Sequence, residues 1–270
     1  MNFIKRTLTA LILLPLLYIS VQYLSDPLFF GIIQAVLLTA LIEFYQLPRK
    51  KFIFPDRVLG VIIALILGAS FIFPEWTLEA ALLCSLAAAI IYFVITTRTL
   101  EKLMAYPVSA ALTFFGAVYL SFTLNHIFWL RKDFGPVIIY FVLVVVFVGD
   151  TGAYLIGKFW GRRKLAPLTS PKKTWEGSAA GILTGIMGGL GMQQIFIPEL
   201  MSPSAAVFYS AVIQIVAQFS DLGESMFKRA SGVKDSSHLL PGHGGFLDRI
   251  DSLILVLPVF YYLLKYSGIS

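Results

Sequence analysis

Long, nearly continuous apolar runs, separated by short polar, glycine or proline segments, dominate the chain. Nine runs approach the ~20 residues that a helix needs to cross ~30 Å of hydrocarbon. They cover residues 7–24, 27–46, 58–74, 77–96, 106–128, 136–157, 177–197, 204–222 and 250–266. Because the runs are continuous rather than alternating, they favour helices over strands. The pattern predicts an all-α, polytopic integral membrane protein with about nine transmembrane helices.

The composition agrees with this pattern. Of the 270 residues, 58% are hydrophobic and only 13% are charged, and the mean hydropathy is +0.83. So few charges cannot coat a soluble domain of this size, and a disordered chain would be far less apolar. The single cysteine, Cys84, excludes an intrachain disulfide and a thiolate metal site.

The basic residues sort to one side of the predicted spans. Of the 21 lysines and arginines, only Arg131, Lys132 and Lys265 flank the opposite side. The positive-inside rule therefore predicts a cytoplasmic N-terminus and a C-terminus outside. The expected location is a bacterial-type inner membrane, with the active site on the cytoplasmic side. Since membrane topology explains the net charge of +6, no nucleic-acid partner is expected.

Two connections are longer than the others, and both are predicted to be cytoplasmic. The chain is expected to comprise residues 1–130, the N-terminal transmembrane helices (spans one to five), and residues 131–270, a C-terminal transmembrane catalytic region. The second part holds spans six to nine and the long loops 158–176 and 223–249. Any chemistry is expected on these two loops.

Carboxylates gather at the cytoplasmic ends of three predicted spans. Asp150 interrupts an apolar run, Asp221 and Glu224 are three residues apart, and so are Asp248 and Asp251. Three-residue spacing places both side chains of a pair on one helix face. Acids at a membrane edge are costly and suggest function, and hard oxygen ligands suit Mg²⁺.

A purely structural role for these acids is the alternative. Asp248 would then pair with Arg249 or Arg229, and Asp221 would only cap a helix end. Two other acids in apolar runs, Glu43 and Glu79, are interpreted as structural.

The first long loop ends with a predicted phosphate site. Ser170 and Pro171 resemble an N-cap and the first position of a helix. A helix N-terminus beside Lys172 and Lys173 would bind phosphate. The alternative for these lysines is attraction to anionic lipid.

The second long loop is basic and rich in glycine. Gly242, Gly244 and Gly245 would let backbone amides approach a ligand closely. His238 and His243 are candidate ligands or acid–base groups, although a loop histidine more often only forms hydrogen bonds. No Walker motif and no G-x-G-x-x-G motif is present. The loop therefore suggests phosphate and metal binding without a P-loop.

Residues 225–251 resemble the signature of the phosphatidate cytidylyltransferases, also called CDP-diacylglycerol synthases. The pattern is S-x-x-K-R, four residues, K-D, and then P-x-H-G-G-x-x-D-R-x-D. Its fixed positions are filled by Ser225, Lys228, Arg229, Lys234, Asp235, Pro241, His243, Gly244, Gly245, Asp248, Arg249 and Asp251. Segments 150–154 and 170–177 are also similar to family motifs. One departure is Ser237, where many members have glycine.

The resemblance implies that the chain transfers CMP from CTP to phosphatidic acid, giving CDP-diacylglycerol and pyrophosphate in phospholipid biosynthesis. Mg²⁺, with a second cation as an open alternative, would neutralise the triphosphate. The expected metal ligands are Asp221, Asp248 and Asp251, followed by Asp150 and Glu224. Lys173 is expected to act with the three first-ranked aspartates in catalysis. The expected substrate-binding residues are Ser170, Lys172, Lys228, Arg229, Lys234, His243, Gly244, Gly245 and Arg249.

Three other functions stay open at this point. A transporter would also carry intramembrane carboxylates, but along a path near the membrane midplane. A CDP-alcohol phosphotransferase would carry a D-G-x-x-A-R motif, and no Asp-Gly dipeptide occurs in the chain. A lipid-binding scaffold gives no reason for so many acids. A homodimer is left open as the oligomeric state.

Overall fold

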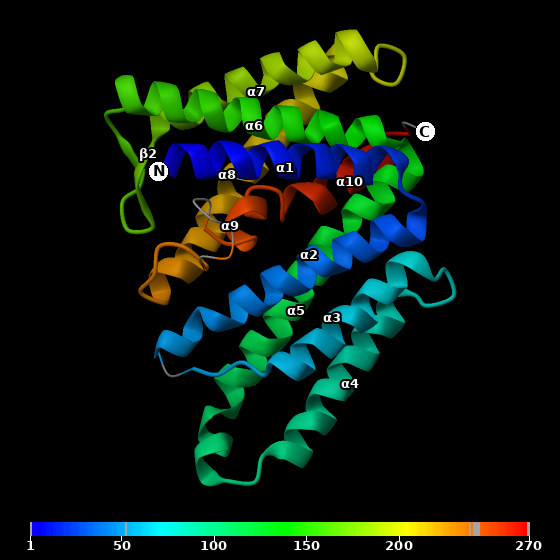
Figure 1. The fold of residues 1–270 in the computed structure, drawn as a ribbon, viewed down its shortest axis with the longest axis vertical. Coiled ribbons are helices and arrows are strands. Elements are labelled where there is room, and N and C mark those ends of the chain that lie inside the picture. The colour runs from blue at the N-terminus through cyan, green and yellow to red at the C-terminus, as the bar shows by residue number, and fades with distance from the viewer. Residues whose placement is uncertain (1, 52, 238, 240–243, 269–270) are drawn as a thin grey trace. The chain divides into compact units, whose positions relative to one another are not determined.

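The computed structural model of the chain is a set of helices with one small hairpin (Figure 1). It describes residues 2–51, 53–237, 239 and 244–268, with the backbone alone for residues 2–10 and 50. The helices are α1 (Asn2–Tyr23), α2 (Asp26–Gln46), the 3₁₀ helix η1 (Pro48–Lys51), α3 (Arg57–Ile72), α4 (Leu78–Thr96), α5 (Leu100–Phe134), α6 (Pro136–Phe159), α7 (Trp175–Phe196), α8 (Pro203–Ala230), α9 (Leu247–Ile250) and α10 (Val256–Ser267). The strands are β1 (Lys164–Ala166) and β2 (Ser170–Thr174).

Six described helices are long and apolar enough to cross a membrane: α2, α4, α5, α6, α7 and α8. This confirms a largely helical integral membrane protein, whereas a count of nine spans stays a prediction. Helix α3 has only 16 residues and α10 only 12. The prediction of one continuous helix over residues 250–266 is wrong, because turns at residues 251–255 separate α9 from α10.

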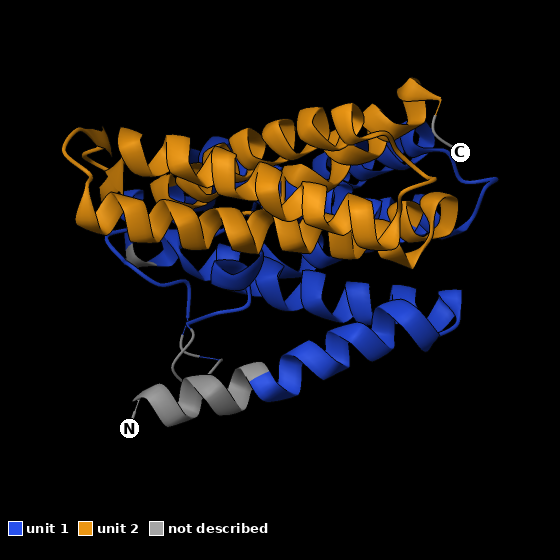
Figure 2. Cartoon of the chain, turned by 90° about the horizontal axis from the view of Figure 1, so that it is seen from above, with its two compact units in different colours: residues 1–128, 227–250 blue, residues 129–226, 251–270 orange. Residues whose placement is uncertain are grey.

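The chain divides into two compact units, which Figure 2 colours separately. Unit 1 comprises residues 1–128 and 227–250, and unit 2 comprises residues 129–226 and 251–270. The boundaries fall inside α5 and α8. The second predicted loop begins later than expected, because α8 continues to Ala230.

In unit 1, α2 contributes a buried face to the core. Tyr45 is fully buried, and its hydroxyl donates to the Thr113 carbonyl of α5. The Phe44 ring packs edge-on against Phe227, with 5.1 Å between the centroids. The last turn of α8 thereby packs against the N-terminal helices of the same unit.

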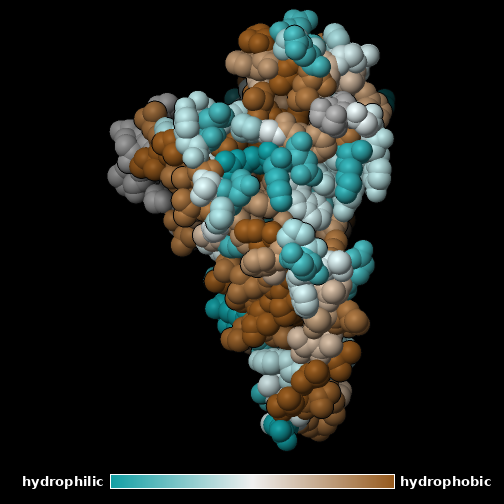
Figure 3. Space-filling model, turned by 90° about the vertical axis from the view of Figure 1, so that its right-hand side faces the viewer, coloured by the Kyte–Doolittle hydropathy of each residue, from teal (hydrophilic) through white to brown (hydrophobic). Residues whose placement is uncertain are grey.

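The α3–α4 hairpin of unit 1 exposes apolar side chains along its length. Leu83, Ile91 and Val94 are each more than half exposed, and the lower part of Figure 3, where this hairpin lies, is largely brown. A soluble protein rarely leaves so large an apolar surface uncovered. Contact with lipid explains it.

In unit 2, α6 and α7 lie side by side (Figure 1). The buried face of α7 carries a glycine at every fourth position, at Gly177, Gly181, Gly185 and Gly189. Such small residues let membrane helices approach closely. At Gly177, an added Cβ would lie 2.7 Å from the carbonyl oxygen of Ala153 in α6.

The hairpin before α7 corrects one prediction. Ser170 and Pro171 begin strand β2, which pairs antiparallel with β1 in the register Lys164 with Thr174. Helix α7 starts only at Trp175, and its N-cap is Thr174, whose hydroxyl accepts from the Gly177 N–H at 3.1 Å. Threonine is a good N-cap, and strand pairing ties up the residues before it. The predicted N-cap at Ser170 is therefore wrong.

Candidate active site

In unit 2, the first polar cluster joins the basic hairpin to α8. The ammonium group of Lys173, on β2, lies 2.6 Å from Asp221 Oδ2. Ser225, one turn further along α8, donates from Oγ to Asp221 Oδ1 at 3.3 Å. Both charged side chains are 28% exposed. The two predicted catalytic residues Lys173 and Asp221 therefore form an ion pair that is partly exposed.

Two further acids of unit 2 are linked by a serine. Ser252 Oγ lies 3.5 Å from Asp150 Oδ2 and 3.4 Å from Asp251 Oδ1, so its single proton serves one carboxylate at a time. The Ser252 N–H donates to Asp251 Oδ1 at 2.7 Å. Asp150 also repels Asp221 and attracts Lys173 electrostatically. Unit 2 thus brings the expected acids Asp150, Asp221 and Asp251 into one interacting set.

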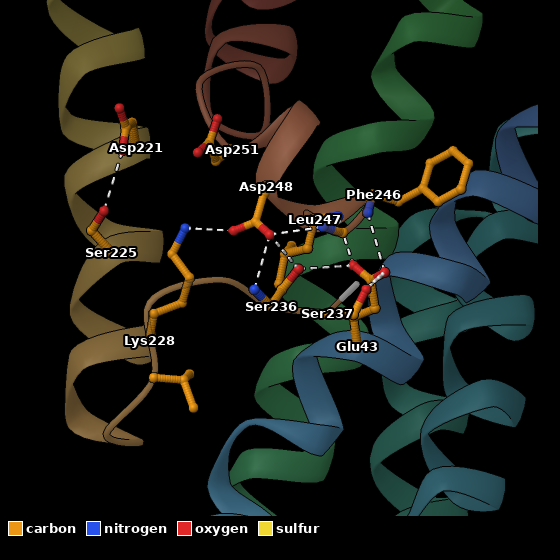
Figure 4. A network of polar contacts seen from close by, with 12 residues as sticks. Glu43, Asp221, Ser225, Lys228, Ser236, Ser237, Phe246, Leu247, Asp248 and Asp251 are labelled. Atoms are coloured by element: carbon orange, nitrogen blue, oxygen red, sulfur yellow. Dashed lines mark hydrogen bonds and ion pairs between the residues drawn. The ribbon is translucent and has the colours of Figure 1, made fainter. Parts of the chain in front are cut away.

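In unit 1, Asp248 is saturated with hydrogen-bond donors (Figure 4). Asp248 Oδ1 accepts from Lys228 Nζ at 2.7 Å. Asp248 Oδ2 accepts from the N–H groups of Ser236 and Gly245 and from the Ser236 hydroxyl, each at 2.9 Å. The partner of Asp248 is therefore Lys228, and the alternative of a pair with Arg249 or Arg229 is wrong. The Lys228 and Asp248 side chains are only 8% and 6% exposed.

These contacts set the charge state of Asp248. Burial by itself raises the pKa of the carboxyl group. The hydrogen bond from Lys228 and those from the Gly245 and Ser236 N–H groups, together with the lysine charge, lower it by more. The pKa of Asp248 therefore lies below its ordinary value, and the group is ionised at neutral pH.

The two described glycines of the H-G-G motif lie against carboxylates of the protein itself. Gly244 has φ +79°, and an added Cβ would lie 2.7 Å from Asp248 Oδ2. Gly245 leaves no room for a side chain beside Glu43 and Ser236. Only glycine tolerates this combination of conformation and close approach. The sequence predicts that these glycines approach a bound ligand. In the structure, they lie against the Asp248 and Glu43 carboxylates of the protein itself.

Glu43 is the residue whose role the sequence did not reveal. Its Oε1 accepts from Ser237 Oγ at 2.6 Å and from the Phe246 N–H at 3.1 Å. Its Oε2 accepts from the Leu247 N–H at 2.9 Å, and Ser236 Oγ lies 3.0 Å from it. The single Ser236 hydroxyl proton serves Glu43 or Asp248, one carboxylate at a time. The side chain is 3% exposed. Figure 4 shows this second carboxylate beside the network of Asp248.

The other predicted site residues have less specific surroundings. Lys172, Lys234 and Arg249 are exposed, as expected for groups that bind a soluble phosphate. Arg229 donates from Nη1 to the Val233 carbonyl at 2.9 Å, which closes the turn after α8. Glu224 is buried. Gly242, His238 and His243 lie outside the described residues.

The donor chemistry can be compared with that of an Mg²⁺ site. Within the described residues, no three histidine, cysteine or acidic side chains are arranged to hold a metal ion. The acids of unit 2 nevertheless supply hard oxygen atoms, and the ammonium of Lys173 already occupies a cation position on Asp221. The donor set fits a hard divalent cation in kind, while its present arrangement does not enclose one.

Fold and site together define a polytopic membrane protein with two lysine–aspartate pairs, Lys173 with Asp221 and Lys228 with Asp248. Residues 4–267 match the model of the cytidylyltransferase family. The phosphatidate cytidylyltransferase of Pseudomonas aeruginosa is 32% identical over 98% of this chain and 97% of its own length. The enzyme of the same name from Thermotoga maritima is 30% identical over 96% and 95%. The chain belongs to the cytidylyltransferase family.

Proposed function

We propose that the chain is a phosphatidate cytidylyltransferase, which transfers CMP from CTP to phosphatidic acid and releases pyrophosphate. The observation that carries the proposal is that the residues of the family signature build the polar clusters. Lys228, Gly245 and Asp248 make one cluster. Ser225, which donates to Asp221, and Asp251 belong to the other. The names of relatives that match nearly the whole chain support the same substrates.

The reaction does not require a strong general base from the protein. The attacking group is an ionised phosphate oxygen, so the chain has to position two anionic substrates and neutralise their charge. We assign phosphate groups of the substrates to Lys173 of unit 2. Lys228, which Asp248 orients through their 2.7 Å contact, stays a substrate-binding prediction from the sequence. The exposed bases Lys172, Lys234 and Arg249 add positive potential that attracts CTP.

Mg²⁺ is part of the proposal. We assign it to Asp150, Asp221 and Asp251, the acids that interact within unit 2. When bound, the ion supplies charge neutralisation of the triphosphate. Asp248 and Glu224 as ligands, and a second cation, stay predictions from the sequence. We further propose that the site faces the cytoplasm of a bacterial inner membrane, with the C-terminus outside.

Pyrophosphate release from the detergent-purified chain tests the proposal. Release should require phosphatidic acid, should prefer CTP over ATP, GTP and UTP, and should stop on chelation and resume with Mg²⁺. Asp221→Asn should lower kcat by about 10²-fold. Lys164→Gln, a change of an exposed base on β1, should leave kcat unchanged. Activity of Asp221→Asn within about threefold of the parent (~0.7 kcal/mol) would contradict the assignment.

A further inference from the structure

Unit 1 contains a cavity that the proposed reaction does not use. Its volume is about 1030 Å³, at the upper end of small-molecule pockets. It lies where the C-terminal end of α4 and the N-terminal ends of α3 and α5 meet the segment after η1. None of its lining residues belongs to the segments 150–154, 170–177 and 225–251 that resemble the family motifs.

Three cationic side chains line this cavity. The Arg49 guanidinium lies 5.7 Å from the centroid of the Phe54 ring. Arg57 Nε is buried and has no hydrogen-bond partner among the described residues. The two arginines are close enough to repel one another. Lys102 Nζ donates to the Thr96 carbonyl at 3.4 Å.

Two acids, Asp56 and Glu101, line the same cavity. The Asp56 carboxylate already accepts hydrogen bonds from neutral donors. Asp56 Oδ1 caps α3 by accepting from the Leu59 N–H at 2.9 Å. Asp56 Oδ2 accepts from the Tyr92 hydroxyl at 2.7 Å, and the Asp56 N–H donates to Thr113 Oγ1 at 2.8 Å. Within the part of the chain that the structure describes, no acid forms an ion pair with Arg49 or Arg57. A buried guanidinium nitrogen without an acceptor is costly, so an anionic group is the ligand that this wall lacks.

The remaining wall is largely apolar, with Thr96, Thr97 and Ser109 among its residues, and it lies at the end of a membrane span. Phe54 and Val58 are 56% and 65% exposed, and Phe93 and Tyr106 are further apolar members of the lining. Aromatic side chains at a span end typically lie at the level of the lipid headgroups. A free phosphate would leave most of this volume unfilled. A phospholipid would place its phosphate on the arginines and its acyl chains against the apolar wall.

We propose that this cavity binds an anionic phospholipid, with the lipid phosphate held by Arg49 and Arg57. Guanidinium groups suit phosphate oxygens because their N–H groups match them in pairs. Basic pockets between membrane helices bind acidic headgroups for the same reason. The site is separate from the residues assigned to catalysis, so its lipid need not be a substrate.

Lipid retention in native mass spectrometry tests this proposal. The full chain is reconstituted in phosphatidylcholine nanodiscs with a minority of phosphatidylglycerol and then extracted into detergent. The retained phosphatidylglycerol is counted for the parent, for Arg49→Gln with Arg57→Gln, and for Arg98→Gln. Arg98 is the matched control, because it is an exposed base at the same end of α4 and does not line the cavity.

We expect the double variant to retain roughly tenfold less phosphatidylglycerol, while Arg98→Gln retains as much as the parent. Equal retention by both would overturn the proposal. Loss of the lipid from the parent in excess inorganic phosphate would overturn the lipid assignment in favour of a free phosphate.

A second variant covers the case in which the double variant does not fold. Ala105→Trp fills the cavity from an exposed position that lines it, and it keeps both arginines. It should also lose the lipid. Undiminished retention by a folded Ala105→Trp protein would overturn the proposal.

Discussion

Glu43 should be required for both stability and activity, although it lies far from the signature segment in sequence. Glu43→Ala removes the acceptor of the Phe246 and Leu247 N–H groups. The side chain is 3% exposed, so water cannot easily replace the carboxylate. Each buried donor left without an acceptor costs about 1–3 kcal/mol, which gives about 2–6 kcal/mol for the pair.

Thermal unfolding of the purified protein in detergent measures this cost. A loss of that size should lower the thermal midpoint by the order of 10 °C. Because Phe246 and Leu247 directly precede Asp248, pyrophosphate release should fall as well. Glu43→Gln keeps the size and one carbonyl oxygen, so its loss should be smaller than that of Glu43→Ala.

Glu79→Ala is the matched control. Glu79 is also an acid within an apolar run, but it is exposed in the first turn of α4. Its interaction with the helix dipole is worth at most ~1 kcal/mol. Equal thermal midpoints and equal activities for the two alanine variants would refute the role given to Glu43.

Three further predictions concern one ion pair and one helix contact. Lys228→Met should destabilise the protein by about 3–5 kcal/mol because it leaves the Asp248 carboxylate buried without its cation, and adding Asp248→Asn should recover part of that loss in a double-mutant cycle of denaturation free energies. The pKa of Asp248 lies below its ordinary 3.8, so its contribution to stability is complete above that value and is lost as the pH falls through the lower folded-state pKa. Denaturation at a series of pH values should show the advantage of the parent over Asp248→Asn shrinking in acid, and an advantage that grew in acid would contradict this sign. Gly177→Ala should cost about 1–3 kcal/mol because its Cβ meets the Ala153 carbonyl, whereas Gly191→Ala has open space and should show no loss of thermal midpoint.

Hydrophobic patterning predicted the helices well and their ends poorly. The apolar run 204–222 marks the core of α8, but the helix continues through polar residues to Ala230. Hydropathy indicates which part of a helix is apolar enough to contact lipid. The backbone hydrogen bonds of the helix can continue beyond that part, so the helix ends later than the apolar run. Conversely, the run 250–266 is apolar except for Asp251, Ser252 and Lys265, and it contains the turns at residues 251–255. Ser220 of α8 binds the first and last of these residues, through the Asp251 carbonyl and the Leu255 N–H.

The pairing of lysines with aspartates was only partly accessible to sequence reasoning. Local spacing on helices led to Asp221, Asp248 and Asp251 as site residues. The contact between Lys173 and Asp221 joins residues 48 positions apart, and that between Glu43 and the Leu247 N–H joins residues 204 positions apart. In both cases, the two residues lie on different elements, and only the folded structure shows that these elements are neighbours. A single apolar-run glutamate carries no sequence signal that separates Glu43 from Glu79.

The fixed residues of the signature cannot all be read as substrate contacts. Gly245 and Ser236 donate to Asp248, and their neighbours donate to Glu43. A substitution at Gly245 therefore disturbs two buried carboxylates before it can affect a nucleotide. Loss of activity there identifies a ligand contact only if the thermal midpoint is unchanged. Lys173 and Asp221 are each 28% exposed, so substitutions at this pair report on substrate binding more directly than those at the buried pair of Lys228 and Asp248.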